Sequence, residues 1–143
     1  MIRSTLLRKT VVGAFALTGN IASAVSPVVG DGCFQLYTEE SLHPVICILA
    51  STEESLSGEG VEVAQIGPNG GPVLSCQETS GMQVTSSSTI FYIGNEELVM
   101  TPKTEKGGTV KDGTTEYLYS RTDEKFTANL LQKVEQSGLC KRR

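Results

Sequence analysis

The chain is poor in the residues that most catalytic motifs need. Its 143 residues include one histidine, His43, and no tryptophan. There is no His-Glu-x-x-His motif, no Gly-x-Ser-x-Gly nucleophile turn and no phosphate-cradling glycine loop. A Ser-His-Asp triad would have to use His43, which precedes a proline and which we interpret as an exposed turn residue. The sequence therefore predicts a protein that is not an enzyme and indicates no cofactor.

The sequence also lacks an apolar run long enough to cross a membrane. The most apolar stretch, residues 10–21, is interrupted by Thr18-Gly19-Asn20. It follows a start rich in positive charge and ends at the small residues Ala22-Ser23-Ala24, a pattern typical of a secretory signal peptide. We therefore expect residues 1–24 to be removed and a mature chain to begin at Val25. This chain would be periplasmic or secreted and not inserted in a membrane.

No Cys-x-x-Cys pair occurs, which disfavours a zinc site and leaves no predicted metal. An even number of cysteines in a short exported chain indicates two disulfides, which can pair in three ways. Spacing favours one local bridge and one long-range bridge, worth about 3 and 4 kcal/mol in the chain-entropy picture. Cys33 would pair with Cys47, and Cys76 with Cys140.

Basic residues are scarce after residue 24, where nine face 16 acidic residues, giving a net charge of −7. Such a surface disfavours binding to nucleic acid or to an anionic membrane and favours a cationic partner. Against this background, Lys106 and Lys111 lie in a glycine-containing polar segment, and Arg121 lies in a nearby predicted turn. We interpret the three as a partner-binding basic loop able to enter a carboxylate-lined cleft. An ordinary hydrated hairpin loop is the alternative.

Four acidic pairs occur along the chain, but adjacent carboxylates in turns are normally both hydrated. We therefore interpret these pairs as surface charge, since general-acid chemistry needs one carboxyl group removed from water. The pairs are Glu39-Glu40, Glu53-Glu54, Glu96-Glu97 and Asp123-Glu124.

About eight short strands, with a turn signal at each join, are predicted for a single domain over residues 25–143. Their spacing of about 8–12 residues is typical of an all-β barrel or sandwich, and we expect a small closed antiparallel barrel. The expected strands are Phe34–Tyr37, Val45–Ala50, Val61–Ile66, Val73–Cys76, Thr89–Ile93, Leu98–Thr101, Glu116–Ser120 and Lys125–Leu131.

Three segments of this domain need separate comment. Thr127–Gln136 also fits a short helix that stops at Gly138, and Ser80–Ser88 fits either a loop or an edge strand. Lys103–Gly113 is expected to be a long polar loop.

Residues 74–143 resemble a known family, the small exported inhibitors of c-type lysozyme in their membrane-bound and periplasmic forms. No counterpart is placed for residues 25–73. The resemblance lies in Leu74-Ser75-Cys76-Gln77, Thr89-Ile90-Phe91-Tyr92, Lys106-Gly107-Gly108-Thr109-Val110-Lys111-Asp112-Gly113, Tyr117-Leu118-Tyr119-Ser120-Arg121-Thr122-Asp123-Glu124 and the late Cys140.

The resemblance implies a small antiparallel β-barrel with a Cys76–Cys140 bridge and an inhibitory loop that inserts into the lysozyme cleft. In that loop, Lys106 and Val110 stand where the family has serine and tyrosine, and in a later turn that also inserts into the cleft, Arg121 stands where the family has lysine. The charge at Arg121 is kept, so a contact with a catalytic carboxylate of the hydrolase is expected.

Two hypotheses follow from the sequence. The first is an exported protein-binding β-domain that inhibits a basic hydrolase such as lysozyme with its basic loop. The alternative is a periplasmic structural or small-ligand-binding barrel, and the ligand-binding form would need an interior cavity of about 300 Å³ or more.

Overall fold

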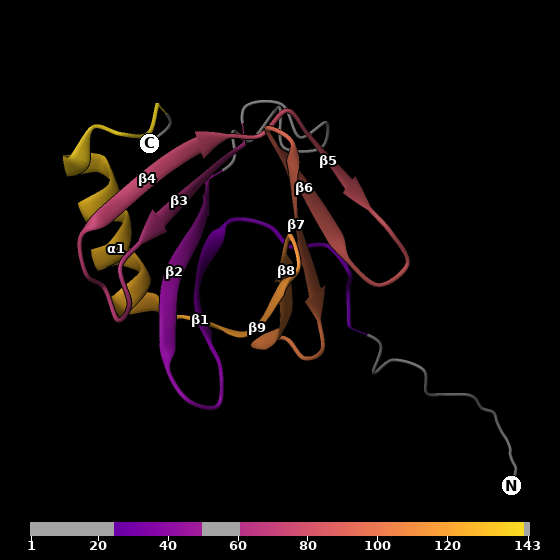
Figure 1. Ribbon diagram of the computed structural model, residues 1–143. Helices are drawn as coiled ribbons and strands as arrows, with labels where there is room; N and C mark the ends of the chain where they lie inside the picture. Colours follow the sequence, from indigo (N-terminus) through magenta and orange to yellow (C-terminus); the bar gives the residue numbers. More distant parts are fainter. Residues whose placement is uncertain (1–24, 50–60, 142–143) are drawn as a thin grey trace, which may run out of the picture.

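The computed structural model describes residues 25–49 and 61–141, which form nine strands and one helix (Figure 1). The strands are β1 (Gly32–Tyr37), β2 (Leu42–Leu49), β3 (Glu62–Ile66), β4 (Val73–Glu78), β5 (Gly81–Val84), β6 (Thr89–Ile93), β7 (Glu96–Pro102), β8 (Gly107–Asp112) and β9 (Thr115–Arg121). They precede the helix α1 (Glu124–Ser137). The predicted signal peptide, Ala50 and the pair Glu53-Glu54 lie outside the described residues.

All nine strands belong to one antiparallel sheet in the order β4-β3-β2-β1-β9-β8-β7-β6-β5. The two edge strands, β4 and β5, follow each other in the chain and are joined only by Thr79 and Ser80. The Thr79 amide donates to the Val61 carbonyl (2.8 Å) and the Ser80 amide to the Tyr92 carbonyl (2.9 Å). The sheet curls until its edges meet at this corner, and from there they diverge (Figure 1).

The expected closed barrel of eight strands is therefore wrong in two respects, although the mainly antiparallel β architecture is confirmed. The sheet is an open half-barrel, because β4 and β5 form no ladder with each other. It has nine strands, because two polar segments form β5 and β8 and the last expected strand is part of a helix. Ser80–Ser88 thus contains an edge strand.

The concave face of the half-barrel carries one apolar core. Alternate residues of the strands point into it, as the two-residue period of a β-strand requires. Without tryptophan, this core is built from aliphatic and smaller aromatic side chains. They are Val29, Phe34, Leu36, Ile46, Ile48, Val61, Val63, Phe91, Leu98, Met100, Val110 and Tyr119.

The helix α1 covers the convex face at the β1–β4 end of the sheet, where a second core lies (Figure 1). Its apolar side is formed by Phe126, Leu130 and Val134, which recur every four residues. The Asp123 carboxylate accepts from the Phe126 amide (2.7 Å) and caps the helix start. Gly138, at φ 71°, ends the helix. The expected strand Lys125–Leu131 is wrong, and the alternative of a helix stopping at Gly138 is confirmed.

The expected polar loop at Lys103–Gly113 is also wrong over most of its length, since it contains β8. The Gly107-Gly108 pair lies at the start of β8. A β-carbon on Gly107 would collide with the Tyr119 carbonyl oxygen, and one on Gly108 with the Thr101 carbonyl oxygen. These glycines therefore permit close packing of β8 against its two neighbours in the sheet.

The expected disulfide pairing is confirmed. Cys33 and Cys47 are directly opposite each other on β1 and β2, with Cα atoms 4.0 Å apart. Cys76 on β4 is bonded to Cys140, which follows α1, across a Cα separation of 5.3 Å. Two disulfides in a domain of this size fit an oxidising compartment. Among the described residues, no helix is long and apolar enough to cross a membrane.

Candidate binding site

Two of the three predicted basic residues lie together at one end of the half-barrel. Strand β9 ends at Arg121, and the Arg121 amide donates to the Lys106 carbonyl (2.6 Å) in the turn between β7 and β8. Lys103 belongs to the same turn, because its amide donates to the Gly107 carbonyl (2.9 Å). We call Lys103, Lys106 and Arg121 the cationic end.

Lys111 lies elsewhere. It is close to the far end of β8, opposite Val99 on β7 and Glu116 on β9. It follows Lys106 by five positions, a distance of about 16 Å along an extended strand at the usual rise per residue. The structure thus brings Lys106 and Arg121 together and leaves Lys111 apart, beside a carboxylate-bearing strand.

The side chain of Arg121 is held in a defined place. Its guanidinium carbon lies 4.7 Å from the centre of the Phe34 ring, within the range of a cation–π contact. Its Nη1 donates to the Asp31 carbonyl (3.3 Å). The side chain remains exposed, so the other guanidinium donors face solvent. Arg121 therefore presents an oriented, always-charged donor fork at the surface.

A cavity of about 390 Å³ opens beside Arg121. Its walls come from the segment before β1, from β1, from the end of β7 and the turn after it, and from β9. The lining residues are Val25, Ser26, Val28, Val29, Phe34, Pro102, Thr104, Glu105, Tyr119 and Arg121.

Tyr119 lines this cavity from the same face of β9 as Arg121, since the two residues are two apart on a strand. Its ring packs edge-on against Phe34, with centroids 5.4 Å apart and planes at 85°. Burial raises the pKa of the phenol above its ordinary value of 10.0, and the Arg121 charge opposes part of this rise. The residue is only 4% exposed, and its hydroxyl has no hydrogen bond within the part of the chain that the structure describes.

The segment before β1 is fastened across the cavity by one buried side chain. The Thr89 hydroxyl accepts from the Val29 amide (3.0 Å) and donates to the Pro27 carbonyl (2.6 Å). Thr89 itself is fully buried at the start of β6. This clamp makes the residues after Val25 a wall of the cavity.

Sequence reasoning missed Phe34, Tyr119 and the Thr89 clamp as parts of the site. The Tyr-Ser-Arg alternation at the end of β9 was the available signal, because it places a phenol and a guanidinium on one face. The role of Thr89 depends on a contact 60 residues along the chain, which no local pattern indicates.

His43 is not the exposed turn residue that was expected. It lies within β2, is half-buried, and its ring centroid is 4.7 Å from that of Tyr117. Its Nε2 lies 3.1 Å from the Ser41 hydroxyl. Among the described residues, no carboxylate is hydrogen-bonded to the other ring nitrogen, so this contact is a pair and not a triad.

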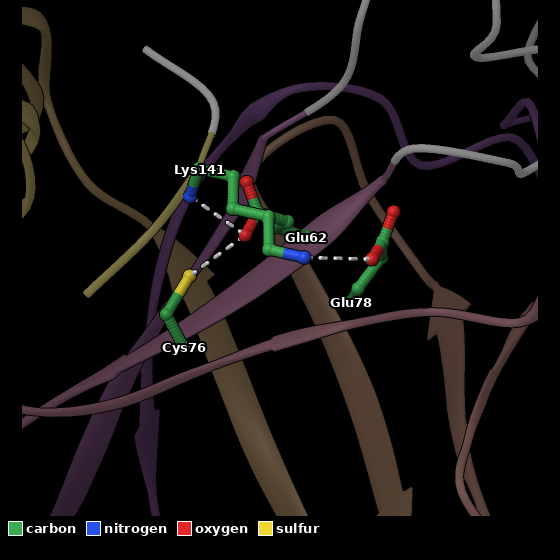
Figure 2. Close-up of polar contacts among 4 residues, drawn as sticks. All are labelled: Glu62, Cys76, Glu78 and Lys141. Atoms are coloured by element: carbon green, nitrogen blue, oxygen red, sulfur yellow. Dashed lines mark hydrogen bonds and ion pairs between the residues drawn. The ribbon is translucent and has the colours of Figure 1, made fainter.

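The carboxylate of Glu62 lies at the opposite edge of the sheet, under the Cys76–Cys140 bridge. It is 3% exposed, and its Oε2 accepts from the Lys141 amide (2.9 Å) and lies 3.7 Å from the Cys76 sulfur (Figure 2). Both neighbouring sulfurs are in a disulfide and cannot act as thiolate metal ligands. Lys141 Nζ reaches Glu78 at 3.9 Å, which adds an exposed ion pair (Figure 2). This cluster anchors the end of the chain after α1.

On the inner side of the half-barrel, the cavity lined by described residues is small. A cavity of about 60 Å³ lies between β3–β4 and the β6–β7 hairpin, with Glu96, Glu97 and Asp112 among its lining residues. This volume is well below that of a typical small-molecule site. The larger cavity at the cationic end is therefore the better candidate.

The chain matches no protein-family model, no curated protein and no solved structure. The resemblance to lysozyme inhibitors thus stays a prediction from the sequence.

Proposed function

We propose that this chain is an exported binding protein that recognises carboxylates of another protein with its cationic end. The hydrogen bond between the Arg121 amide and the Lys106 carbonyl carries the proposal, because it keeps two cations on adjacent backbone. The rest of the molecule is acidic, so this end differs from its surroundings in charge. Such a pattern favours a partner with a mainly basic surface and an acidic cleft.

A cell-wall hydrolase such as a c-type lysozyme is the first partner to test. Its catalytic carboxylates would pair with Arg121 and Lys106, and the turn between β7 and β8 would fill its groove. Arginine suits this role because its planar fork binds a carboxylate through two parallel hydrogen bonds. Lys111 would take no part, since it lies near the other end of β8.

The test is a titration of lysozyme-catalysed cell-wall lysis with the oxidised protein, exported with its own leader. We expect inhibition near one-to-one stoichiometry that weakens as salt rises, because exposed charges are screened. Arg121→Glu and Lys106→Glu should each weaken inhibition by about tenfold or more, since each introduces like-charge repulsion. Lys111→Glu makes the same change in net charge at the far end of β8 and should act like the unmodified protein.

Equal effects of all three substitutions would mean that only net charge matters and would contradict the proposal. Inhibition that is absent, or unaffected by Arg121→Glu, would also contradict it.

A further inference from the structure

Two residues that line the cavity at the cationic end, Tyr119 and Arg121, carry polar groups without a side-chain hydrogen-bond partner among the described residues. The Tyr119 hydroxyl is buried without a hydrogen bond in the described part of the chain, although a buried polar group normally has a partner. The Arg121 guanidinium uses one donor on the Asp31 carbonyl, and its other donors have no hydrogen bond to a described residue. Both residues project from the same face of β9.

The charge and the walls of this cavity restrict what it can hold. Arg121 and Glu105 are the charged side chains of its lining, and in a mature chain that begins at Val25 the α-amino group of that residue would add a second cation. A dianion such as phosphate would lie beside the Glu105 carboxylate and would have no apolar group to place against the rest of the wall. Much of the remaining wall is apolar and comes from Val25, Val28, Val29, Phe34 and Pro102.

We propose that this cavity binds a small monocarboxylate with an apolar body. Its carboxylate would accept hydrogen bonds from the Arg121 guanidinium and the Tyr119 hydroxyl. Its apolar body would lie against Phe34 and the clamped segment around Val28, which is 56% exposed and would lose this exposure to water. The site is separate from the proposed protein contact at Lys106, although both use Arg121.

The size of the cavity agrees with such a ligand. Its volume of about 390 Å³ lies in the lower part of the range for small-molecule sites. Val29 and Pro27 are fixed by the buried Thr89 hydroxyl, so this wall is in place before a ligand arrives. A preformed wall lowers the entropy cost of binding.

The test is calorimetric titration of the oxidised protein with phenylacetate, with phenylacetamide and inorganic phosphate as comparison probes. The amide has the same apolar body without the charge, and phosphate has the charge without the body. We expect phenylacetate to bind at least about tenfold more tightly than phenylacetamide, because a hydrogen bond to a charged group is stronger than a neutral one. Phosphate should give no binding up to about 10 mM.

Two substitutions locate the binding to this cavity. Tyr119→Phe removes only the hydroxyl and should weaken phenylacetate binding about tenfold, whereas Arg121→Met should remove it. Lys111→Met changes a cation outside the cavity and should leave binding unchanged, and circular dichroism confirms that each variant is folded. Equal binding of the acid and the amide, an unaffected Tyr119→Phe variant, or no binding at all would overturn the proposal. In the last case water alone satisfies the hydroxyl.

The same variants separate this proposal from the protein-binding one. Lys106→Glu should impair lysozyme inhibition and spare phenylacetate binding, while Tyr119→Phe should do the reverse. If Lys106→Glu has no effect on lysis and Tyr119→Phe still weakens phenylacetate binding, the protein contact fails and the cavity stands. If Lys106→Glu impairs the inhibition of lysis and Tyr119→Phe leaves phenylacetate binding unchanged, only the cavity proposal fails.

Discussion

The position and burial of some residues in this protein depend on contacts with residues that are distant in the sequence. Arg121 was identified from its charge, yet its position depends on Phe34 below it and on the Asp31 carbonyl beside it. The sequence did not indicate that Glu62 is buried, because a single glutamate between two valines is usually a charged residue on the surface of a strand. Its burial follows from the disulfide and from Lys141, which lies 79 residues further along the chain.

Replacing Glu62 with alanine should lower the free energy of unfolding by about 1–3 kcal/mol, because the Lys141 amide would lose its charged acceptor in a partly buried hydrogen bond. Glu78 is the direct cross-strand neighbour of Glu62 and serves as the matched control. Its ion pair with Lys141 is exposed, so Glu78→Ala should cost less than about 1 kcal/mol. Urea denaturation under oxidising conditions measures both, and similar values for the two variants would contradict the assigned role of Glu62.

Tyr119 provides a test by pH. Because burial raises its pKa above 10.0 in the folded protein, the folded state binds this proton more tightly than the unfolded state does. Its contribution to stability is therefore complete below pH 10 and is lost as pH rises through the folded pKa. A spectrophotometric titration of the folded protein should show one phenol ionising above the ordinary value, and Tyr119→Phe should lack it. An unchanged titration curve in that variant would contradict the burial of this phenol.

At the scale of secondary-structure elements, most strands follow directly from alternating or β-branched runs bounded by turn residues. Two elements, α1 and β8, could not be predicted in this way. The Phe126, Ala128, Leu130 spacing fits one face of a strand, while Phe126, Leu130 and Val134 fit one face of a helix. The Asp123 cap and the apolar surface of β1–β4 favour the helix. Packing on that surface is a tertiary contact, which the local sequence does not show.

Strand β8 was missed for a related reason. Among its residues only Val110 is buried, so its composition resembles that of a loop. Pairing with β7 on one side and β9 on the other makes it a strand. This pairing is a property of the whole sheet, and the polar sequence does not reveal it.

The cap of α1 is testable by one substitution. Asp123→Ala should destabilise the protein by about 1 kcal/mol, because the Phe126 amide loses its acceptor at the helix start. Glu124→Ala keeps the cap, removes a neighbouring acidic residue and serves as the control. Thermal unfolding monitored by circular dichroism compares the two, and equal midpoints would contradict the role of Asp123 as the cap.

At the scale of the whole molecule, the sequence predicted the disulfide pairing and the antiparallel architecture but not the way the sheet ends. Closure depends on whether the first and last strands in the sheet order can pair. Here those strands are β4 and β5, which are adjacent in the chain and diverge from the Thr79-Ser80 corner. The spacing of strands along the chain does not show whether the two edge strands pair. The sequence therefore could not distinguish an open half-barrel from a closed barrel.

The arrangement of the whole molecule also assigns the two ends of β8 different roles. One end carries Lys106 beside Arg121 and the cavity, and the other carries Lys111 beside Glu116. A binding protein of this design would use only the first end. The separation between the ends makes the central claim measurable residue by residue.

The most direct test is mapping of backbone amide shifts in the nuclear magnetic resonance spectrum as c-type lysozyme is added to the isotope-labelled, oxidised protein. We expect shifts to concentrate in residues 103–107 and 119–122, with residues 111–116 unchanged. Shifts concentrated at the Lys111 end, or no shifts at low salt, would contradict the account.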